Sequence, residues 1–206
     1  MIGMARGSGS RMRAPIIAAL AVQVIIPADM PKLASDLRQG MTLVYASGGQ
    51  DQPPWSIVSV EAGAALKEQA DCARVRIRRR PDEVEPEDSR LCVEQQILYA
   101  WNTDRAAWLP QRPVGPNMDL TIPRAGGGSV RYVTGSVGVD VVGARRLRVV
   151  DTTVTTIDAA GKTVRRLRER YALSLATATG GRFETPDPER PGQWLTQQIF
   201  ELREIR

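Results

Sequence analysis

The sequence predicts an all-β fold: an antiparallel meander that closes into a barrel or half-barrel of about nine to ten strands. Beyond residue 40, apolar residues recur at every second position, which is the period of a half-buried strand. Gly-, Pro- and Asp-containing turns separate these stretches, with no helix between them that could serve as a βαβ crossover. The 206 residues are 42% apolar and 25% charged, which is ordinary for one globular domain. A β-sandwich is the alternative architecture.

Residues 1–28 have the pattern of a cleavable secretory signal. Three arginines precede an apolar stretch from Ala14 to Ala28, and no acidic residue comes before Asp29. As a helix this stretch would be about 22 Å long, shorter than the ~30 Å hydrocarbon core of a membrane. We therefore expect cleavage after Ala28, no membrane anchor afterwards, a single domain at 29–206, and a periplasmic or extracellular location. A helix packed in the core is the alternative interpretation.

One short helix is predicted after this signal, from Pro31 to Gln39. Leu33 and Leu37 are four residues apart and would share one face of the helix. Pro31 suits the first turn, and Gly40 suits the position after the last one. The helix would be a cap on the barrel rather than a core element.

The first half of the barrel is predicted from alternating residues. Strands are expected at 43–45 and at 55–60, the second with a bulge. Residues 73–77 alternate apolar side chains with arginines, which predicts one buried and one charged face. A returning strand is expected at 91–99, with the acidic stretch 81–88 as the turn.

The second half is predicted as two hairpins and a final strand. The strands are expected at 118–122, 130–142, 146–157, 163–175 and 194–205. Residues 125–129 and 158–161 supply the glycine-containing turns. The proline-rich stretches at 52–55, 110–116 and 186–192 are interpreted as loops.

Cys72 and Cys92 are the only cysteines, and an even count in an exported protein predicts a disulfide. Both share the phase of the polar residues in their strands, so the bond is expected on the outer face. A turn at about 80–89 would put the two residues out of step. We therefore expect a bulge or a skewed loop to bring them together.

Composition excludes several classes of site. The chain has no histidine, which removes Ser-His-Asp triads, Cys-His pairs and His-ligated metals. Residues 1–28 carry three arginines and no acid, so their removal lowers the net charge from +5 to +2, which gives little basis for nucleic-acid binding. Gly126 to Gly128 precede a strand rather than a helix and are interpreted as a turn, not a phosphate loop. No metal site and no cofactor are predicted.

Glu169 is the candidate polar residue inside the barrel. In the strand at 163–175 it shares the phase of Leu167, Tyr171 and Leu173, so its carboxylate should face the apolar side. It could act there as an acid or anchor a ligand, with Tyr171 beside it. The alternatives are a buried ion pair with an arginine, or a strand phase shifted by one residue.

Tryptophans near the ends of predicted strands complete the candidate site. Trp55, Trp101 and Trp108 lie close to Pro, Gln or Asn, and Arg112 follows Trp108. Tryptophan with arginine can line a sugar or lipid-headgroup site, because the ring offers flat apolar area and one donor. The alternative is that these rings fill the core.

Four short motifs resemble those of exported bacterial proteins of domain-of-unknown-function type, which look like lipocalin-type or lipoprotein-carrier-type barrels. The motifs lie at 113–118, 149–153, 158–162 and 169–171. The resemblance spans about residues 40–206 and consists of strand and turn patterns. It implies a secreted β-barrel with an apolar interior, and it implies no activity and no functional residue.

These observations predict a non-enzymatic exported module that binds a lipid, another apolar or amphipathic molecule, or a partner in the cell envelope. One alternative is a histidine-free hydrolase that uses inward carboxylates such as Glu169. Another is a structural envelope protein. No catalytic residue is assigned, because no nucleophile motif is present.

Overall fold

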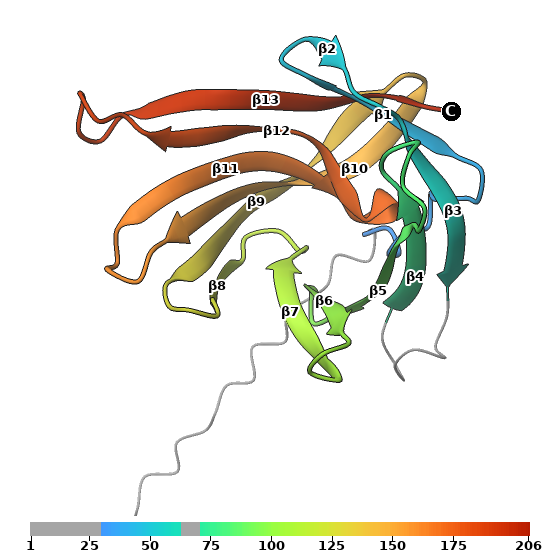
Figure 1. Ribbon diagram of the computed structural model, residues 1–206, viewed down its shortest axis with the longest axis horizontal. Helices are drawn as coiled ribbons and strands as arrows, with labels where there is room; N and C mark the ends of the chain where they lie inside the picture. The colour runs from blue at the N-terminus through green and yellow to red at the C-terminus, as the bar shows by residue number, and fades with distance from the viewer. Residues whose placement is uncertain (1–29, 63–70) are drawn as a thin grey trace, which may run out of the picture.

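The computed structural model describes residues 30–62 and 71–206, which form one continuous antiparallel sheet curved into a nearly closed barrel (Figure 1). The predicted all-β antiparallel meander is confirmed, and the architecture is a barrel rather than the alternative sandwich. The predicted signal at residues 1–28 lies outside the described residues. Within those residues, no helix is long and apolar enough to cross a membrane.

The strands are β1 (Thr42–Ser47), β2 (Gln50–Asp51), β3 (Trp55–Ala62), β4 (Asp71–Arg78), β5 (Glu87–Glu94), β6 (Ile97–Asn102), β7 (Ala107–Pro113), β8 (Asp119–Pro123), β9 (Ser129–Val142), β10 (Arg145–Ile157), β11 (Thr163–Ala172), β12 (Thr177–Pro186) and β13 (Trp194–Ile205). A short 3₁₀ helix, η1 (Leu173–Leu175), connects β11 to β12.

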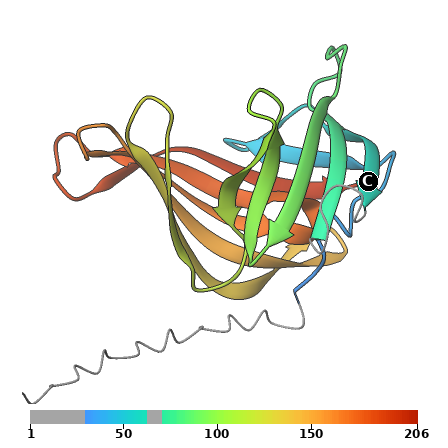
Figure 2. The ribbon, with the colours of Figure 1, turned by 90° about the horizontal axis from the view of Figure 1, so that it is seen from below.

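Twelve strands lie side by side in the order β7-β6-β5-β4-β3-β1-β13-β12-β11-β10-β9-β8, and β2 pairs only with β1. Strands close in sequence are therefore neighbours, and β1 and β13 join the two ends of the meander. The two sheet edges, β7 and β8, lie close together across a short connection. The long strands β9 to β13 extend past the shorter strands β5 to β7 at one end of the barrel (Figure 2).

The predicted number of strands is too low, in part because two boundaries lack the usual turn residues. The strand expected at 91–99 is two strands, β5 and β6, whose turn places Gln95 and Gln96 at positive φ of 49° and 62°. The connection from β11 to β12 uses Ala176 at a φ of 50°. Glycine and asparagine are the residues that normally mark such positions, so β12 was missed.

Strand β7 was also missed, because its prolines were interpreted as a loop. Pro110 and Pro113 both lie within β7, opposite Tyr99 and Ile97 of β6. Strand β7 is an edge of the sheet, and an edge strand tolerates a residue that cannot donate a backbone hydrogen bond.

The predicted helix at Pro31–Gln39 is wrong, and the segment forms turns instead. Ala34 has a φ of 55°, and its N–H donates to the carbonyl of Leu173 in η1. The N–H of Asp36 donates to the carbonyl of Ser174 in the same way. Tertiary partners thus satisfy the backbone groups that a helix would have paired internally. The leucine spacing nevertheless identified two core residues, since Leu33 and Leu37 are both buried.

The core joins this N-terminal segment to η1 and to the inward side chains of the barrel. Its buried members include Leu37, Leu43, Ile57, Val75 and Leu175. Each side chain of this size stabilises the fold by roughly 1.5–3 kcal/mol when it leaves water. The N-terminal segment therefore closes one end of the barrel as the predicted cap would have done, with a different backbone.

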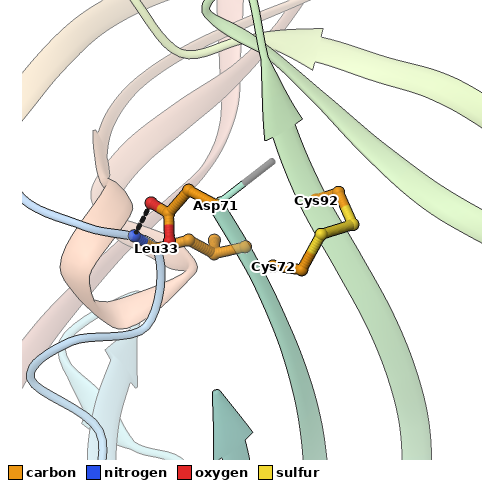
Figure 3. The surroundings of a disulfide bond; sticks show 4 residues. All are labelled: Leu33, Asp71, Cys72 and Cys92. Carbon is orange, nitrogen blue, oxygen red and sulfur yellow. Dashed lines mark hydrogen bonds between the residues drawn. A yellow bond between two sulfur atoms is a disulfide. The ribbon is translucent and has the colours of Figure 1, made fainter. Parts of the chain in front are cut away.

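The disulfide between Cys72 and Cys92 is present and links β4 to β5 (Figure 3). The two residues are directly paired with a Cα–Cα distance of 4.0 Å, so the expected bulge or skewed loop is absent. The register differs because Glu87 to Ser89 belong to β5 rather than to the turn, and Asp88 there pairs with Arg74 across the strands. Both cysteines are buried.

The N-terminal segment is fixed to β4 beside this bond. The N–H of Leu33 donates to Oδ2 of Asp71 at 2.6 Å, and Asp71 directly precedes Cys72 (Figure 3). The disulfide and this hydrogen bond together hold the start of β4 between β5 and the closing segment.

Candidate functional site

A pocket of about 680 Å³ lies on the inner face of the barrel, where β1, β3, β7, β11, β12 and β13 converge. Its lining residues are Tyr45, Ala46, Ser47, Gln52, Pro53, Trp55, Arg79, Arg80, Arg112, Glu169, Tyr171, Ala176, Thr177, Ala178, Gln198 and Phe200. Tyr45, Glu169 and Tyr171 are buried at its floor, whereas Arg79 and Arg80 are exposed at its rim. The pocket therefore has a closed inner end and an open outer end.

A buried ion pair forms part of the floor. Arg112 of β7 donates from Nη2 to Oε1 of Glu169 of β11, and their side chains are only 14% and 6% exposed. The Arg112 guanidinium also lies over the Tyr171 ring, 3.9 Å from its centroid. Gly181 of β12 is paired with Glu169 of β11. A Cβ atom added at Gly181 would lie only 3.0 Å from the Cβ atom of Glu169. Glycine thus leaves room for the carboxylate beside the strand.

An aromatic wall leads from the floor to the rim. The rings of Tyr45 and Trp55 are 4.5 Å apart between centroids, and the Arg79 guanidinium lies 4.7 Å from the centroid of Trp55. The Tyr45 hydroxyl donates to the carbonyl of Ala178 at 2.9 Å, which fixes the ring. Phe200 of β13 lines the same pocket. These side chains offer flat apolar surface between two charged ends.

The structure brings together four of the six predicted site residues. Trp55, Arg112, Glu169 and Tyr171, from three different strands, line the same pocket. The predicted ligand-binding role of these residues stays a prediction. The alternative expectation for Glu169, a buried ion pair with an arginine, matches the contact with Arg112.

The other two tryptophans lie elsewhere. Trp101 and Trp108 face each other across β6 and β7 with their ring centroids 5.5 Å apart, and they do not line this pocket. Their contact is an edge-to-face pair, the geometry typical of aromatic packing.

Sequence reasoning missed several lining residues that the fold brings in from distant segments. Arg79 and Arg80 directly precede the acidic stretch 81–88 that is predicted as a turn, and Tyr45 and Phe200 lie in the strands predicted at 43–45 and 194–205 without a functional role. Only the closure of the meander, which pairs β1 with β13, brings these segments to one place. In the sequence, the feature that could have indicated this site is the run of arginines at the end of a predicted strand, next to the acidic turn.

Burial of the floor changes the proton affinity of its tyrosines. Loss of water raises the pKa of Tyr171 to about 12 and that of Tyr45 to about 12, and it also raises the pKa of Tyr132. The Arg112 guanidinium opposes the rise at Tyr171, which it contacts, but burial dominates.

These shifts predict loss of stability in alkali. An exposed tyrosine has a pKa near 10, so between about pH 10 and about pH 12 the unfolded chain loses phenol protons that the folded protein retains. Stability present below about pH 10 should then fall as the pH rises towards 12. A pH titration followed by phenolate absorbance should show tyrosines that ionise only as the protein unfolds. The variant Tyr171→Phe should have one fewer of these late-ionising tyrosines. Ionisation of all four tyrosines near pH 10 in folded protein would contradict the burial.

No group of three or more Cys, Asp or Glu residues in the described parts of the chain is placed to hold a metal ion. A second pocket of about 670 Å³ lies across β9 to β13, and its lining combines exposed side chains such as Arg168 and Arg182 with buried ones that include Glu169. The first pocket differs in holding both partners of the Arg112–Glu169 ion pair together with the aromatic wall, which makes it the candidate binding site.

Comparisons with protein-family models, with curated protein sequences and with solved structures find no match for this chain. The resemblance to lipocalin-type and lipoprotein-carrier-type proteins is therefore confirmed only at the level of architecture. What is shown is an antiparallel, nearly closed β-barrel of twelve strands.

Proposed function

We propose that this protein is a non-enzymatic binding module that holds an amphipathic small molecule in the pocket beside β1, β7 and β11. The observation that carries the proposal is the pocket itself: about 680 Å³, with a buried floor and an open rim. Sites for small molecules usually enclose about 300–1,000 Å³ and combine apolar walls with a few fixed polar groups. The signal pattern of residues 1–28 supports a periplasmic or extracellular location for this binding.

The distribution of side chains supports an amphipathic ligand. Trp55, Tyr45 and Phe200 offer apolar contact along the wall, while charged groups stand at both ends. A ligand of mixed character can leave its polar group at the rim and bury its apolar part against the rings. An entirely apolar molecule would leave the guanidinium of Arg80 at the rim without a counter-charge.

The state of Glu169 favours binding over hydrolysis. A general acid must present a proton to the substrate, whereas Oε1 of Glu169 accepts a hydrogen bond from Nη2 of Arg112. Glu169 thus serves better as the counter-charge of Arg112. A search for hydrolytic activity in the wild type and in Glu169→Gln tests the enzymatic alternative.

Native mass spectrometry of protein purified from a bacterial envelope tests the proposal. We expect a mass excess that disappears on denaturation, and recovery of that excess when the emptied protein is incubated with a lipid extract. A protein that is consistently empty, and takes up nothing on incubation, would contradict the proposal.

A variant that fills the pocket should weaken this binding. Ala178 lines the pocket, and Ala178→Leu would occupy part of the space beside Tyr45. We expect about tenfold weaker uptake, which corresponds to about 1.4 kcal/mol. Ala125→Leu, in the exposed turn between β8 and β9, makes the same change away from the pocket and should bind as the wild type does. Equal uptake by Ala178→Leu would place the ligand elsewhere.

A further inference from the structure

Among the side chains that line the pocket, positive charge exceeds negative charge. Arg79, Arg80 and Arg112 contribute three guanidinium groups, and Glu169 contributes the one carboxylate. A pocket with this balance attracts anions, because field lines concentrate where like charges line a concave surface. The three arginines differ in how far other side chains already neutralise them.

Two of these arginines already have partners. Arg112 is paired with Glu169 at the floor and stacked on Tyr171. Arg79 has its Nε 2.8 Å from Oε2 of Glu87, and it also lies over Trp55. Glu87 does not itself line the pocket. Its carboxylate therefore neutralises the charge of Arg79 from outside the pocket, and only in part.

Arg80 has no ion pair or side-chain hydrogen bond in the described parts of the chain. It stands at the exposed rim, where a turn positions its backbone: the N–H of Glu83 donates to the carbonyl of Arg80 at 3.2 Å. The same turn is held from its other side, where the N–H of Arg79 donates to Oε2 of Glu83 at 2.7 Å. The loop therefore places a free guanidinium beside an aromatic wall.

We propose that the ligand of this pocket is an anionic amphiphile whose carboxylate or phosphate is bound by Arg80, with Arg79 beside it, while its apolar part lies against Trp55 and Phe200. A guanidinium presents its N–H donors in a planar fork that matches a carboxylate or a phosphate, and such charge-assisted hydrogen bonds are the strong ones. This inference rests on the proposed binding function and adds the charge of the ligand to it.

The test compares four probes with the same alkyl chain and different headgroups: dodecanoate, dodecyl phosphate, dodecanol and dodecyltrimethylammonium. Binding to the full folded protein is measured by isothermal titration calorimetry below the micelle concentration of each probe. We expect the two anions to bind about tenfold or more tighter than dodecanol, and the cation to bind more weakly than dodecanol. A preference between the two anions tells whether the natural group is a carboxylate or a phosphate.

Two variants assign the effect to the rim. Arg80→Gln should lower the affinity for dodecanoate or dodecyl phosphate about tenfold and leave dodecanol binding unchanged. Arg124→Gln removes another exposed arginine, in the turn between β8 and β9 and far along the chain from the rim, and should change neither affinity. Both side chains are exposed, so the two variants should fold, which circular dichroism checks.

The outcomes separate this inference from the proposed function. Equal binding of dodecanol and both anions would refute the anionic ligand while leaving a binding pocket in place, and tighter binding of the cation would do the same. Anion preference that survives in Arg80→Gln would refute the role of that residue. Failure of all four probes to bind would overturn the proposed function itself.

Discussion

Replacement of Glu169 by glutamine is expected to destabilise the protein by about 3–5 kcal/mol, because it leaves the charge of Arg112 buried without its counter-charge. The Arg112 side chain is only 14% exposed, so water cannot readily replace the lost carboxylate. Glutamine keeps the shape of the side chain, which restricts the effect to the charge. Denaturation with urea, followed by tryptophan fluorescence, measures the difference in the free energy of unfolding.

The double variant Arg112→Gln with Glu169→Gln separates the ion pair from packing. It removes both charges and should recover much of the stability that Glu169→Gln loses, since a neutral pair costs less to bury than a single charge. The exposed pair of Asp119 and Arg131, whose side chains are each 52% exposed, gives a matched control. Asp119→Asn should have a far smaller effect. A loss in Glu169→Gln as small as that of the control would show that the pair is not buried in solution.

Removal of the disulfide is the second large effect, with an expected loss of about 2–5 kcal/mol. Cys72 and Cys92 are 20 residues apart, and in the chain-entropy model closing a loop of that size stabilises the fold by roughly 3 kcal/mol. The variant Cys72→Ala with Cys92→Ala should therefore melt at a lower temperature than the wild type. Chemical reduction of the wild type should lower its melting temperature in the same direction.

Ligand binding provides the control for this variant. Neither cysteine lines the candidate pocket, so the affinity for dodecanoate should be unchanged below the lowered melting temperature. The bond itself is checked by titration of thiols in denatured, unreduced protein. Two reactive thiols per chain would contradict the disulfide and the oxidising compartment expected from residues 1–28.

Much of the barrel could be predicted from the sequence, because an alternating pattern reports burial directly. Alternation predicts the strand at 73–77, and the glycine turns at 125–129 and 158–161 place the hairpins that contain the strands at 130–142 and 146–157. The errors occurred where backbone conformation and residue type disagree. Gln95, Gln96 and Ala176 adopt positive φ without being glycine, so nothing in the sequence marked those turns.

Tertiary context explains the remaining differences. The N-terminal segment has helical leucine spacing, but Ala34 and Asp36 donate their backbone hydrogen bonds to η1 rather than to their own turn. The whole acidic stretch at 81–88 is predicted as a turn. In the structure, its last residue, Asp88, pairs with Arg74 and belongs to β5. Local patterns do not record which partner a charged or polar group will meet.

The candidate site was predictable only in part for the same reason. Glu169 stood out because a carboxylate in the phase of apolar residues needs an explanation, and the fold supplies Arg112 as its partner. The rim arginines did not stand out, since exposed arginines are common and acquire meaning only beside the aromatic wall. Their position depends on the pairing of β1 with β13, which joins the first and last strands of the meander.

The location of a bound probe tests the central claim most directly, and a crystal structure of the protein with dodecanoate measures it. The proposed function predicts electron density for the alkyl chain between Trp55 and Phe200, above the ion pair of Arg112 and Glu169. Density on the outer face of β9 to β13, or an empty pocket in crystals grown at saturating dodecanoate, would contradict it.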